Sequence, residues 1–340
     1  MAVRGVFGGS VGDTGTTAFL HQDRTEPTLS QARGWRRLLA REEHEADLGR
    51  RRFVLRHGPA GMIIEDAEKS YLFGFNAVVS QELGKIEELP PRQRAFGYEG
   101  AGAACTALDL LTLTRGRRLH ELLAGPAAHH QYAVHLGAGR GYALLRLRPV
   151  RRAKRSHPLL RWLAVDGYGF QRGLDHTDRM VGERAMPDLP TRAFCGTFDQ
   201  GLGRLLWYHD CASPGDVAAR ISAYPAGRRA DLWSGAGFAA TRVGGAGPED
   251  LERLAEHAGA DGFRAHLAQG CAFAAATGLW ASPPPEHVEQ AVRALTGTEP
   301  GEAASWVDDA LTALGHDPHT HDDFLAWQAG TRRAWAGRHG

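Results

Sequence analysis

Acidic and imidazole side chains recur beside glycines in the middle of this chain, and they are the residues best suited to chemistry. Glu99, Asp166, His176 and Asp199 stand in or next to Gly-containing words inside apolar stretches. A carboxylate and an imidazole that face one apolar cavity can exchange protons with a bound molecule. We therefore predict these four residues as acid–base catalytic groups.

A second set of polar and aromatic residues shares this placement, and we predict that its members contact a substrate. They are His135, Tyr168, Gln200, Arg229, Asp231, Trp233, His266 and Gln269. The alternative interpretation is structural: Glu99, Gln200 and Gln269 cap or cross-link neighbouring helices. Arg204 and Arg229 would then be their partners. The sequence leaves both interpretations open.

Other motifs with known chemistry are incomplete. No Gly-x-Ser-x-Gly elbow occurs, and His120-Glu121 lacks the second histidine of a metalloprotease helix. Gly235-x-Gly237-x-x-Ala240 fits the loose dinucleotide fingerprint without a preceding buried strand, so no organic cofactor is expected. Imidazoles and carboxylates crowd between His316 and Asp323. An exposed loop is the more ordinary interpretation, and we predict no functional metal site.

The elements that must position these residues are marked by a short word that recurs along the chain: a glycine, a small or apolar residue, then usually Gly or Ala. Its first glycines are Gly100, Gly137, Gly173, Gly201, Gly235 and Gly270, at intervals of 37, 36, 28, 34 and 35 residues. A glycine inside a helix costs about 1 kcal/mol relative to alanine. Close approach of neighbouring helix backbones supplies the compensating reason. Such periods indicate stacked helix-turn-helix units.

Strand signals are scarce, so the predicted fold is all-α: helix-turn-helix repeats of about 35 residues in an α-solenoid, as in tetratricopeptide-like stacks. We expect a poorly packed N-terminal arm (1–50), a helical-repeat domain (51–330) and a tail (331–340). The segment 126–147 parallels 225–243 with its glycines in step. Two duplicated halves, about 53–180 and 190–315, are therefore expected, although composition alone would also align such helices.

Composition excludes several classes of protein. Lys and Arg number 40 against 39 Asp and Glu, a balance that argues against nucleic-acid binding. The basic run from Arg140 to Arg161 is interpreted as a solvated inter-helix loop. No apolar stretch approaches the ~18–20 residues that span a bilayer, and the four cysteines form no close pair. We expect reduced thiols and a cytoplasmic protein, and the Ala, Arg and Gly content suggests a bacterial source.

Several words of four to eight residues resemble the UnbL-type family of enediyne antibiotic biosynthesis. They are Phe96-Gly97-Tyr98-Glu99-Gly100, His157-Pro158-Leu159-Leu160-Arg161-Trp162-Leu163, Asp166-Gly167-Tyr168-Gly169-Phe170, Phe198-Asp199-Gln200-Gly201-Leu202-Gly203-Arg204, Arg228-Arg229-Ala230-Asp231-Leu232-Trp233-Ser234-Gly235 and His266-Leu267-Ala268-Gln269-Gly270. The resemblance runs from about Phe53 to about Leu311. It implies a role in turning a linear polyene into an enediyne core, or in a related polyketide or terpenoid pathway. Gln171-Arg172 departs from it where a histidine is expected, which points to a different substrate.

Two hypotheses follow. The first is an accessory enzyme of secondary metabolism that acts by acid–base chemistry on an apolar polyene-like intermediate in a cavity of the stack. The second is a non-catalytic carrier or scaffold that holds the intermediate or docks the polyketide synthase. An enclosed pocket with two or more of the predicted groups pointing inward would favour the enzyme. The expected partners are the small molecule and pathway proteins, with neither nucleic acid nor a membrane.

Overall fold

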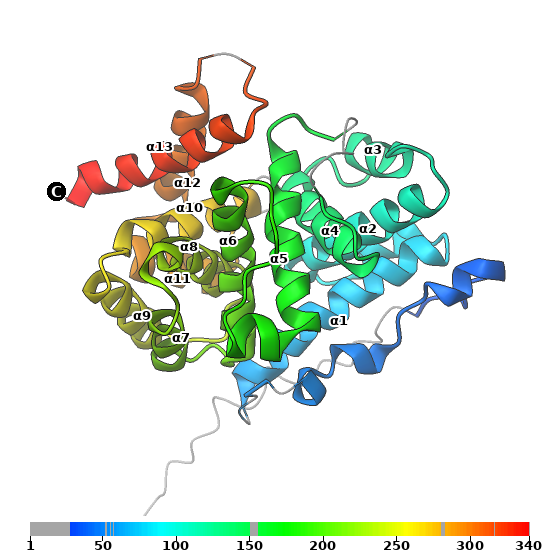
Figure 1. Cartoon of the computed structure of the whole chain (residues 1–340), viewed down its shortest axis with the longest axis horizontal. Helices are drawn as coiled ribbons and strands as arrows, with labels where there is room; N and C mark the ends of the chain where they lie inside the picture. The colour runs from blue at the N-terminus through cyan, green and yellow to red at the C-terminus, as the bar shows by residue number, and fades with distance from the viewer. Residues whose placement is uncertain are drawn as a thin grey trace, which may run out of the picture.

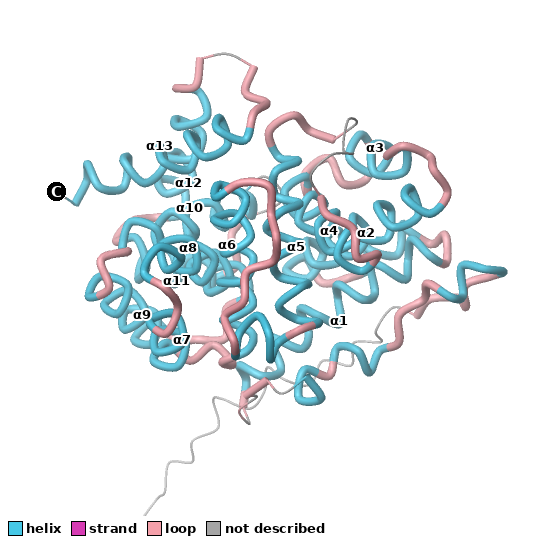
Figure 2. The backbone as a smooth tube through the Cα atoms, viewed as in Figure 1, coloured by secondary structure: helices cyan, strands magenta, loops and turns pink. Residues whose placement is uncertain are grey.

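The computed structural model describes residues 28–51, 53–54, 56, 58–149, 156–279, 283–315 and 317–339. Every regular element in these ranges is a helix, which confirms the all-α prediction (Figure 2). The α-helices are α1 (Pro59–Val79), α2 (Pro91–Leu111), α3 (Arg117–Ala124), α4 (Gln131–Leu144), α5 (Leu163–Asp175), α6 (Arg192–His209), α7 (Pro214–Ser222), α8 (Ala226–Val243), α9 (Pro248–Ala260), α10 (Arg264–Leu279), α11 (Glu286–Thr296), α12 (Pro300–Thr312) and α13 (His321–His339). Short 3₁₀ helices are η1 (Gly34–Leu38), η2 (Glu43–Ala46), η3 (Leu48–Arg51), η4 (Leu83–Glu88) and η5 (Leu160–Trp162), and η6 (Asp178–Gly182) is a π-helical turn.

Long helices form a continuous row through the molecule, in the order α1, α2, α4, α5, α6, α8 and α10 (Figure 1). Each packs against the next one in this order. Helices α7, α9 and α11 lie beside one another outside the row, and α3 lies against α2. Helices α12 and α13 cover α10. The row also curves, because α8 contacts α1 as well as its neighbours α6 and α10.

Pairs of glycines two residues apart make these close contacts. A Cβ atom at Gly137 of α4 would overlap the carbonyl oxygen of Glu99 in α2, and one at Gly139 would overlap that of Ala164 in α5. The first glycine of each pair thus meets the preceding helix and the second meets the following one. The same rule holds for Gly100 and Gly102, Gly167 and Gly169, Gly201 and Gly203, and Gly235 and Gly237. The predicted close approach of helix backbones at these glycines is therefore correct.

The prediction of a backbone contact is wrong for one glycine of the series, Gly173. Gly173 of α5 faces the side chains of Leu202 and Leu205, whereas Gly167 and Gly169 make the backbone contacts of that helix. The first glycines of the pairs in α2, α4, α5, α6 and α8 and Gly270 of α10 are therefore spaced by 37, 30, 34, 34 and 35 residues. The division of the row into two duplicated halves stays a prediction.

The structure corrects three further expectations. Residues 28–51, predicted as a loose arm with one exposed helix, form short turns that pack on α1, with Ala46 and Leu48 fully buried. The tail predicted from 331 continues α13, and Thr331 is buried. Arg140, assigned to a solvated basic loop, is a buried residue of α4. Positions 1–27 and 150–155, the centre of that basic run, lie outside the described residues.

None of the helices in the described ranges combines the length and the apolar character needed to cross a bilayer.

Candidate functional site

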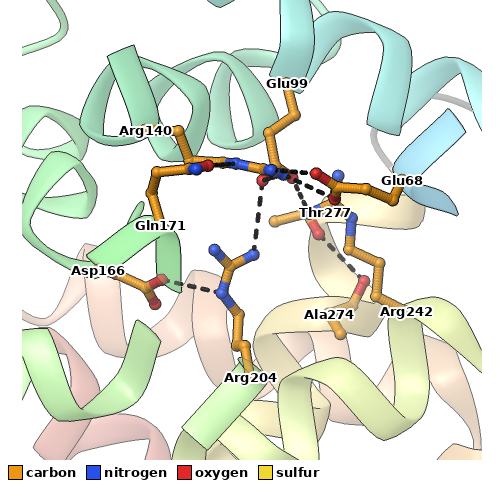
Figure 3. Close-up of polar contacts among 9 residues, drawn as sticks. All are labelled: Glu68, Glu99, Arg140, Asp166, Gln171, Arg204, Arg242, Ala274 and Thr277. Atoms are coloured by element: carbon orange, nitrogen blue, oxygen red, sulfur yellow. Dashed lines mark hydrogen bonds and ion pairs between the residues drawn. The ribbon is translucent and has the colours of Figure 1, made fainter. Parts of the chain in front are cut away.

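Six ionisable side chains from different helices of the row meet in the interior and form what we call the charge centre. They are Glu68 of α1, Glu99 of α2, Arg140 of α4, Asp166 of α5, Arg204 of α6 and Arg242 of α8 (Figure 3). Five of them are at most 5 % exposed, and the side chain of Arg242 is 11 % exposed. Three arginines and three carboxylates thus share one buried site.

Glu99 is the hub of the charge centre. Its Oε2 accepts a hydrogen bond from Arg242 Nη1 (2.6 Å), and its Oε1 lies 3.6 Å from Arg140 Nη1 and 3.9 Å from Arg204 Nη1. Burial alone would raise the pKa of Glu99, but these three guanidinium groups hold it below its usual value. Because Arg242 is 143 residues away along the chain, Glu99 ties α2 to the distant α8.

Aromatic rings alternate with the arginines. The guanidinium of Arg140 lies 3.3 Å from the ring centroid of Tyr71 and 4.8 Å from that of Phe170. Arg204 faces Phe170 at 4.9 Å and Phe238 at 5.8 Å. Arg242 continues the series between Phe238 (5.9 Å) and Phe96 (4.4 Å). These cation–π contacts help to hold three like charges in one apolar interior.

Arg140 is the most completely paired of the three arginines. It makes a two-point contact with the carboxylate of Glu68, in which Arg140 Nη1 donates to Glu68 Oε2 at 3.2 Å. Its Nε donates to Gln171 Oε1 at 2.8 Å. Gln171 is the residue at which the sequence departs from the resemblance noted above, so that departure falls inside the charge centre (Figure 3).

Asp166 and Arg204, unlike Glu68 and Arg140, make fewer hydrogen bonds than their polar atoms allow. Arg204 Nε donates to Asp166 Oδ1 at 2.9 Å. Burial nevertheless raises the pKa of Asp166 to about 6, since Arg204 offsets only part of the desolvation. Arg204 Nη2, Arg242 Nη2 and the Tyr71 hydroxyl are buried without a hydrogen-bond partner among the described residues. The charge centre therefore combines a carboxyl that titrates near neutrality with unused guanidinium donors.

This arrangement is suited to polar chemistry in an apolar interior. A buried donor without an acceptor costs about 1–3 kcal/mol, and buried ion pairs rarely add stability over apolar packing. Shifted pKa values and preorganised donors are typical of functional sites. An acceptor atom within hydrogen-bond distance would satisfy either Arg204 Nη2 or Arg242 Nη2. Asp166 could accept or return a proton beside it.

A second buried polar layer lies where α13 covers the row, and it contains three predicted substrate-binding residues. Gln200 and Gln328 of α13 exchange two hydrogen bonds, at 3.0 and 2.8 Å. Gln200 also donates to Asp231 Oδ1 at 2.9 Å, and Gln269 accepts from Arg332 of α13. We call Gln200, Asp231, Gln269, Gln328 and Arg332 the α13 interface. Gln200 and Gln269, predicted to contact a substrate, thus contact the chain's own last helix.

An aromatic layer separates the α13 interface from the charge centre. Trp327 of α13 packs against Phe273 (ring centroids 4.7 Å apart), and Phe273 contacts Tyr132 at 6.2 Å. Tyr132 stacks on Phe238 at 5.3 Å, and Phe238 faces both Arg204 and Arg242. We call Tyr132, Phe238, Phe273 and Trp327 the aromatic layer. It forms a continuous line of contacts from α13 to the arginines.

Other predicted residues lie outside these two regions. Asp199 is buried on α6 and paired with Arg228, whose Nη2 and Nε donate at 2.6 and 2.9 Å. Burial raises the pKa of Asp199 to about 6. Arg229 and Trp233 both donate to Asp261, at 3.0 and 2.9 Å, and so link α8 to the end of α9. These contacts join neighbouring segments of the chain, and Arg229 pairs with Asp261 rather than with Glu99, Gln200 or Gln269 as the structural alternative had it.

The three predicted histidines are dispersed. His135 is buried on α4: its Nδ1 lies 2.6 Å from the carbonyl oxygen of Gln131, and its Nε2 accepts from the His157 backbone at 3.2 Å. Burial lowers its pKa to about 4, so it is neutral. His176 is exposed at the end of α5 beside Arg172. His266 contacts Phe263, and burial lowers its pKa to about 4. Tyr168 is buried against Phe198.

Sequence analysis found Glu99 and Asp166 but missed four partners: Glu68, Arg140, Gln171 and Arg242. One available signal was the residue that follows the second glycine of each pair. Arg140, Phe170, Arg204 and Phe238 occupy this position in four successive helices of the row, and all four face the charge centre. No comparable signal marks Glu68 or Arg242.

Within the described ranges, no three His, Cys, Asp or Glu side chains are gathered as a metal ion would require. In the predicted His-rich segment, Asp323 accepts from the backbone of His319 and Thr320 at the start of α13. His321 is buried among Trp162, Phe194 and Phe324. His316 lies outside the described residues.

A family model described as "Protein of unknown function (DUF1702)" matches residues 30–334. No curated protein and no solved structure matches the chain.

Proposed function

This chain belongs to the DUF1702 family, and we propose that it is an enzyme whose reaction takes place at the charge centre. The observation that carries the proposal is the pairing of Asp166, whose pKa is about 6, with Arg204, whose Nη2 has no partner among the described residues. A general acid–base group works best when its pKa lies near the working pH. A guanidinium donor held ready in a buried site stabilises negative charge that develops on an oxygen.

The proposed reaction is a proton shift in an apolar, polyene-like intermediate that carries a carbonyl group. Asp166 takes a proton from a carbon conjugated with the carbonyl, and Arg204 and Arg242 stabilise the negative charge on the carbonyl oxygen. The same proton returns to a different carbon of the conjugated chain. Atoms and charge balance without an oxidant or reductant, so this chemistry requires no cofactor.

The pathway assignment rests on the resemblance to the UnbL-type family. The words that carry it include Glu99, Asp166 and Arg204 of the charge centre, and Phe96 and Phe170, whose rings face its arginines. We infer a cytoplasmic accessory enzyme of enediyne or related polyketide biosynthesis, built from a repeated helix pair of about 35 residues. The regular glycine pairs support the repeat. A polyketide synthase is the expected protein partner.

The test is conversion of the linear polyene released by the pathway's polyketide synthase, followed by absorbance and mass spectrometry. Asp166→Asn is expected to lower the rate by at least about 100-fold, and the wild-type rate should rise as the pH passes through 6. Asp210→Asn is the matched control, because Asp210 is equally buried and paired with Arg220 away from the charge centre. Conversion by Asp166→Asn at the wild-type rate would refute the assignment of Asp166.

A non-catalytic carrier is the second candidate, and the cover that α13 places over the polar layer favours it. A carrier would bind the polyene and leave its mass and its covalent structure unchanged. Binding by the wild type, with neither mass nor product spectrum altered on release, would therefore replace the enzyme by the carrier.

A further inference from the structure

We propose that α13 is a lid over the charge centre, and that it admits a molecule with an apolar conjugated body and an anionic or carbonyl oxygen at one end. The inference rests on the proposed function, because it takes the charge centre as the site that the molecule reaches. It adds the class of ligand, the route of entry and the element that moves.

The position of α13 along the shared helices is the first observation. On α6, Gln200 belongs to the α13 interface and Arg204 to the charge centre, and the two are four residues apart. On α8, Ser234 binds Gln269 and Phe238 faces Arg204, again four residues apart. Residues four apart lie on one face of a helix. The α13 interface therefore covers the same interior face that holds the charge centre, one helical turn away.

The kind of contact that α13 makes is the second observation. Its inner polar contacts with the row include an amide pair with Gln200, a bond from Arg332 to the amide of Gln269, and a contact of His321 with Thr197 at 3.0 Å. Uncharged hydrogen bonds such as the amide pair contribute about 0.5–1.5 kcal/mol each, and a bond from a charged donor about 1.5–3 kcal/mol, because water replaces them on opening. Burial lowers the pKa of Arg332, and Asp231 offsets only part of that shift. Release of α13 returns the Arg332 guanidinium to water, and this hydration lowers the free-energy cost of opening.

The ligand class follows from what lies beneath the lid. Trp327 occupies one end of the aromatic layer, and Phe273, Tyr132 and Phe238 continue the layer to the arginines. An apolar conjugated chain that replaces Trp327 would stack on these rings. At the inner end, Arg204 Nη2 and Arg242 Nη2 offer hydrogen atoms without an acceptor among the described residues. A guanidinium can only donate, so the group that pairs with it must be an acceptor, and a carboxylate or carbonyl oxygen is the strongest such partner.

Parinaric acid, a conjugated tetraene with a carboxylate at one end, is the probe. Its fluorescence rises when it leaves water, so stopped-flow mixing with the full-length chain gives its association rate and Kd. We expect saturable binding and a weaker affinity for its methyl ester. The variant Gln328→Ala/Arg332→Ala should raise the association rate about threefold or more, because the lid opens more often. An unchanged rate would overturn the lid.

The oxygen site is tested with Arg204→Met, which should raise the Kd of parinaric acid at least about tenfold through loss of a charge-assisted contact. Arg204→Lys should recover part of the affinity. Arg220→Met is the control, since Arg220 pairs with Asp210 outside the charge centre, and it should leave Kd unchanged. Equal Kd values for wild type and Arg204→Met would overturn the ligand class.

Hydrogen–deuterium exchange tests the lid without any ligand and remains informative if Arg204→Met fails to fold. Amides of α13 should exchange at least about tenfold faster than those of α8, through opening that leaves the row intact. Gln328→Ala/Arg332→Ala should speed exchange in α13 alone. Equal exchange in α13 and α8 would overturn the lid. Binding of parinaric acid without conversion of the pathway polyene would instead leave the lid standing and remove the proposed catalysis.

Discussion

The charge centre and the α13 interface are two buried polar layers on one face of the same helices, yet they are built differently. The charge centre holds three arginines and three carboxylates, locked by two-point contacts and by alternating aromatic rings. The α13 interface holds three amides, one arginine and one aspartate, and its central contact is an uncharged amide pair. The difference teaches that ion pairs and cation–π contacts hold the charge centre, whereas amide hydrogen bonds carry most of the polar contact between α13 and the row.

The largest expected effect comes from removing the hub of the charge centre. Glu99→Gln leaves Arg140, Arg204 and Arg242 close together without their shared carboxylate, so the free energy of unfolding should fall by about 3–5 kcal/mol. Urea unfolding measures it. Glu121→Gln is the control: Glu121 forms an exposed pair with Arg117, which contributes about 1 kcal/mol or less. Equal losses for the two variants would contradict the special role of Glu99.

The next largest effect is expected at a glycine where the backbones of two neighbouring row helices meet. The Cβ of Gly201→Ala would overlap the backbone of Asp166, so α5 and α6 must separate. We expect a loss of about 3 kcal/mol in urea unfolding. Gly259→Ala in α9 has open space around the new methyl group. It should gain up to about 1 kcal/mol through helix propensity. Two variants with the same sign of effect would show that backbone contact at the glycine pairs does not set the fold.

Acidification should destabilise the row of helices, because it protonates the neutral imidazole of His135, which is buried on α4. Burial lowers the pKa of His135 to about 4 in the folded chain, from the ordinary histidine value of 6.5 in the unfolded chain. The unfolded chain therefore binds the proton first, and stability present above pH 6.5 is lost as the pH falls toward 4. Between pH 7 and pH 5 this site should cost about 2 kcal/mol. His157 faces His135, and burial lowers the pKa of His157 as well.

The measurement is the pH dependence of urea unfolding for the wild type and His135→Gln. The variant should lose less stability between pH 7 and pH 5 than the wild type. His257→Gln, at an exposed position of α9, should leave the pH dependence as it is. A wild-type slope retained in His135→Gln would contradict the assignment of a neutral buried imidazole.

The smallest effect is expected at the α13 interface. Replacing Gln200 and Gln328 together by leucine removes the amide pair and also the hydrogen bond that Gln200 donates to Asp231, so stability should fall by about 1–2 kcal/mol. Gln200→Leu alone should cost more than the pair, because it also leaves the amide of Gln328 without its partner. A double-mutant cycle in urea measures this coupling. A loss in the double variant as large as that of Glu99→Gln would erase the distinction between the two layers.

Much of the frame could be predicted from the sequence, because it depends on local chemistry. Glycines at a regular phase in apolar helical stretches cost stability unless helix backbones meet there, and they do meet at Gly137, Gly201 and Gly235. Gly173 misled the analysis, since it lies four and six residues after the pair that makes the contacts of α5. The period alone does not distinguish these positions.

The site could be predicted only in part, because its partners come from distant segments. Glu99 and Asp166 stood beside the glycines and were found. Arg140 was assigned to a solvated run by the charge of its neighbours, although its place after Gly139 could have revealed it. The pairing of Arg242 with Glu99 depends on the curvature of the whole row. Coverage of Gln200 and Gln269 by α13 depends on how the last helix docks, which local spacing does not encode.

The most direct test of the central claim is titration of Asp166 and Asp199 by ¹³C NMR of carboxyl-labelled protein, with and without parinaric acid. Asp166→Asn and Asp199→Asn assign the signals, because burial raises the pKa of both aspartates to about 6. We predict that the probe shifts the titration of Asp166 in the charge centre and leaves that of Asp199 in place. A probe that binds and moves neither titration, or moves only that of Asp199, would contradict the account.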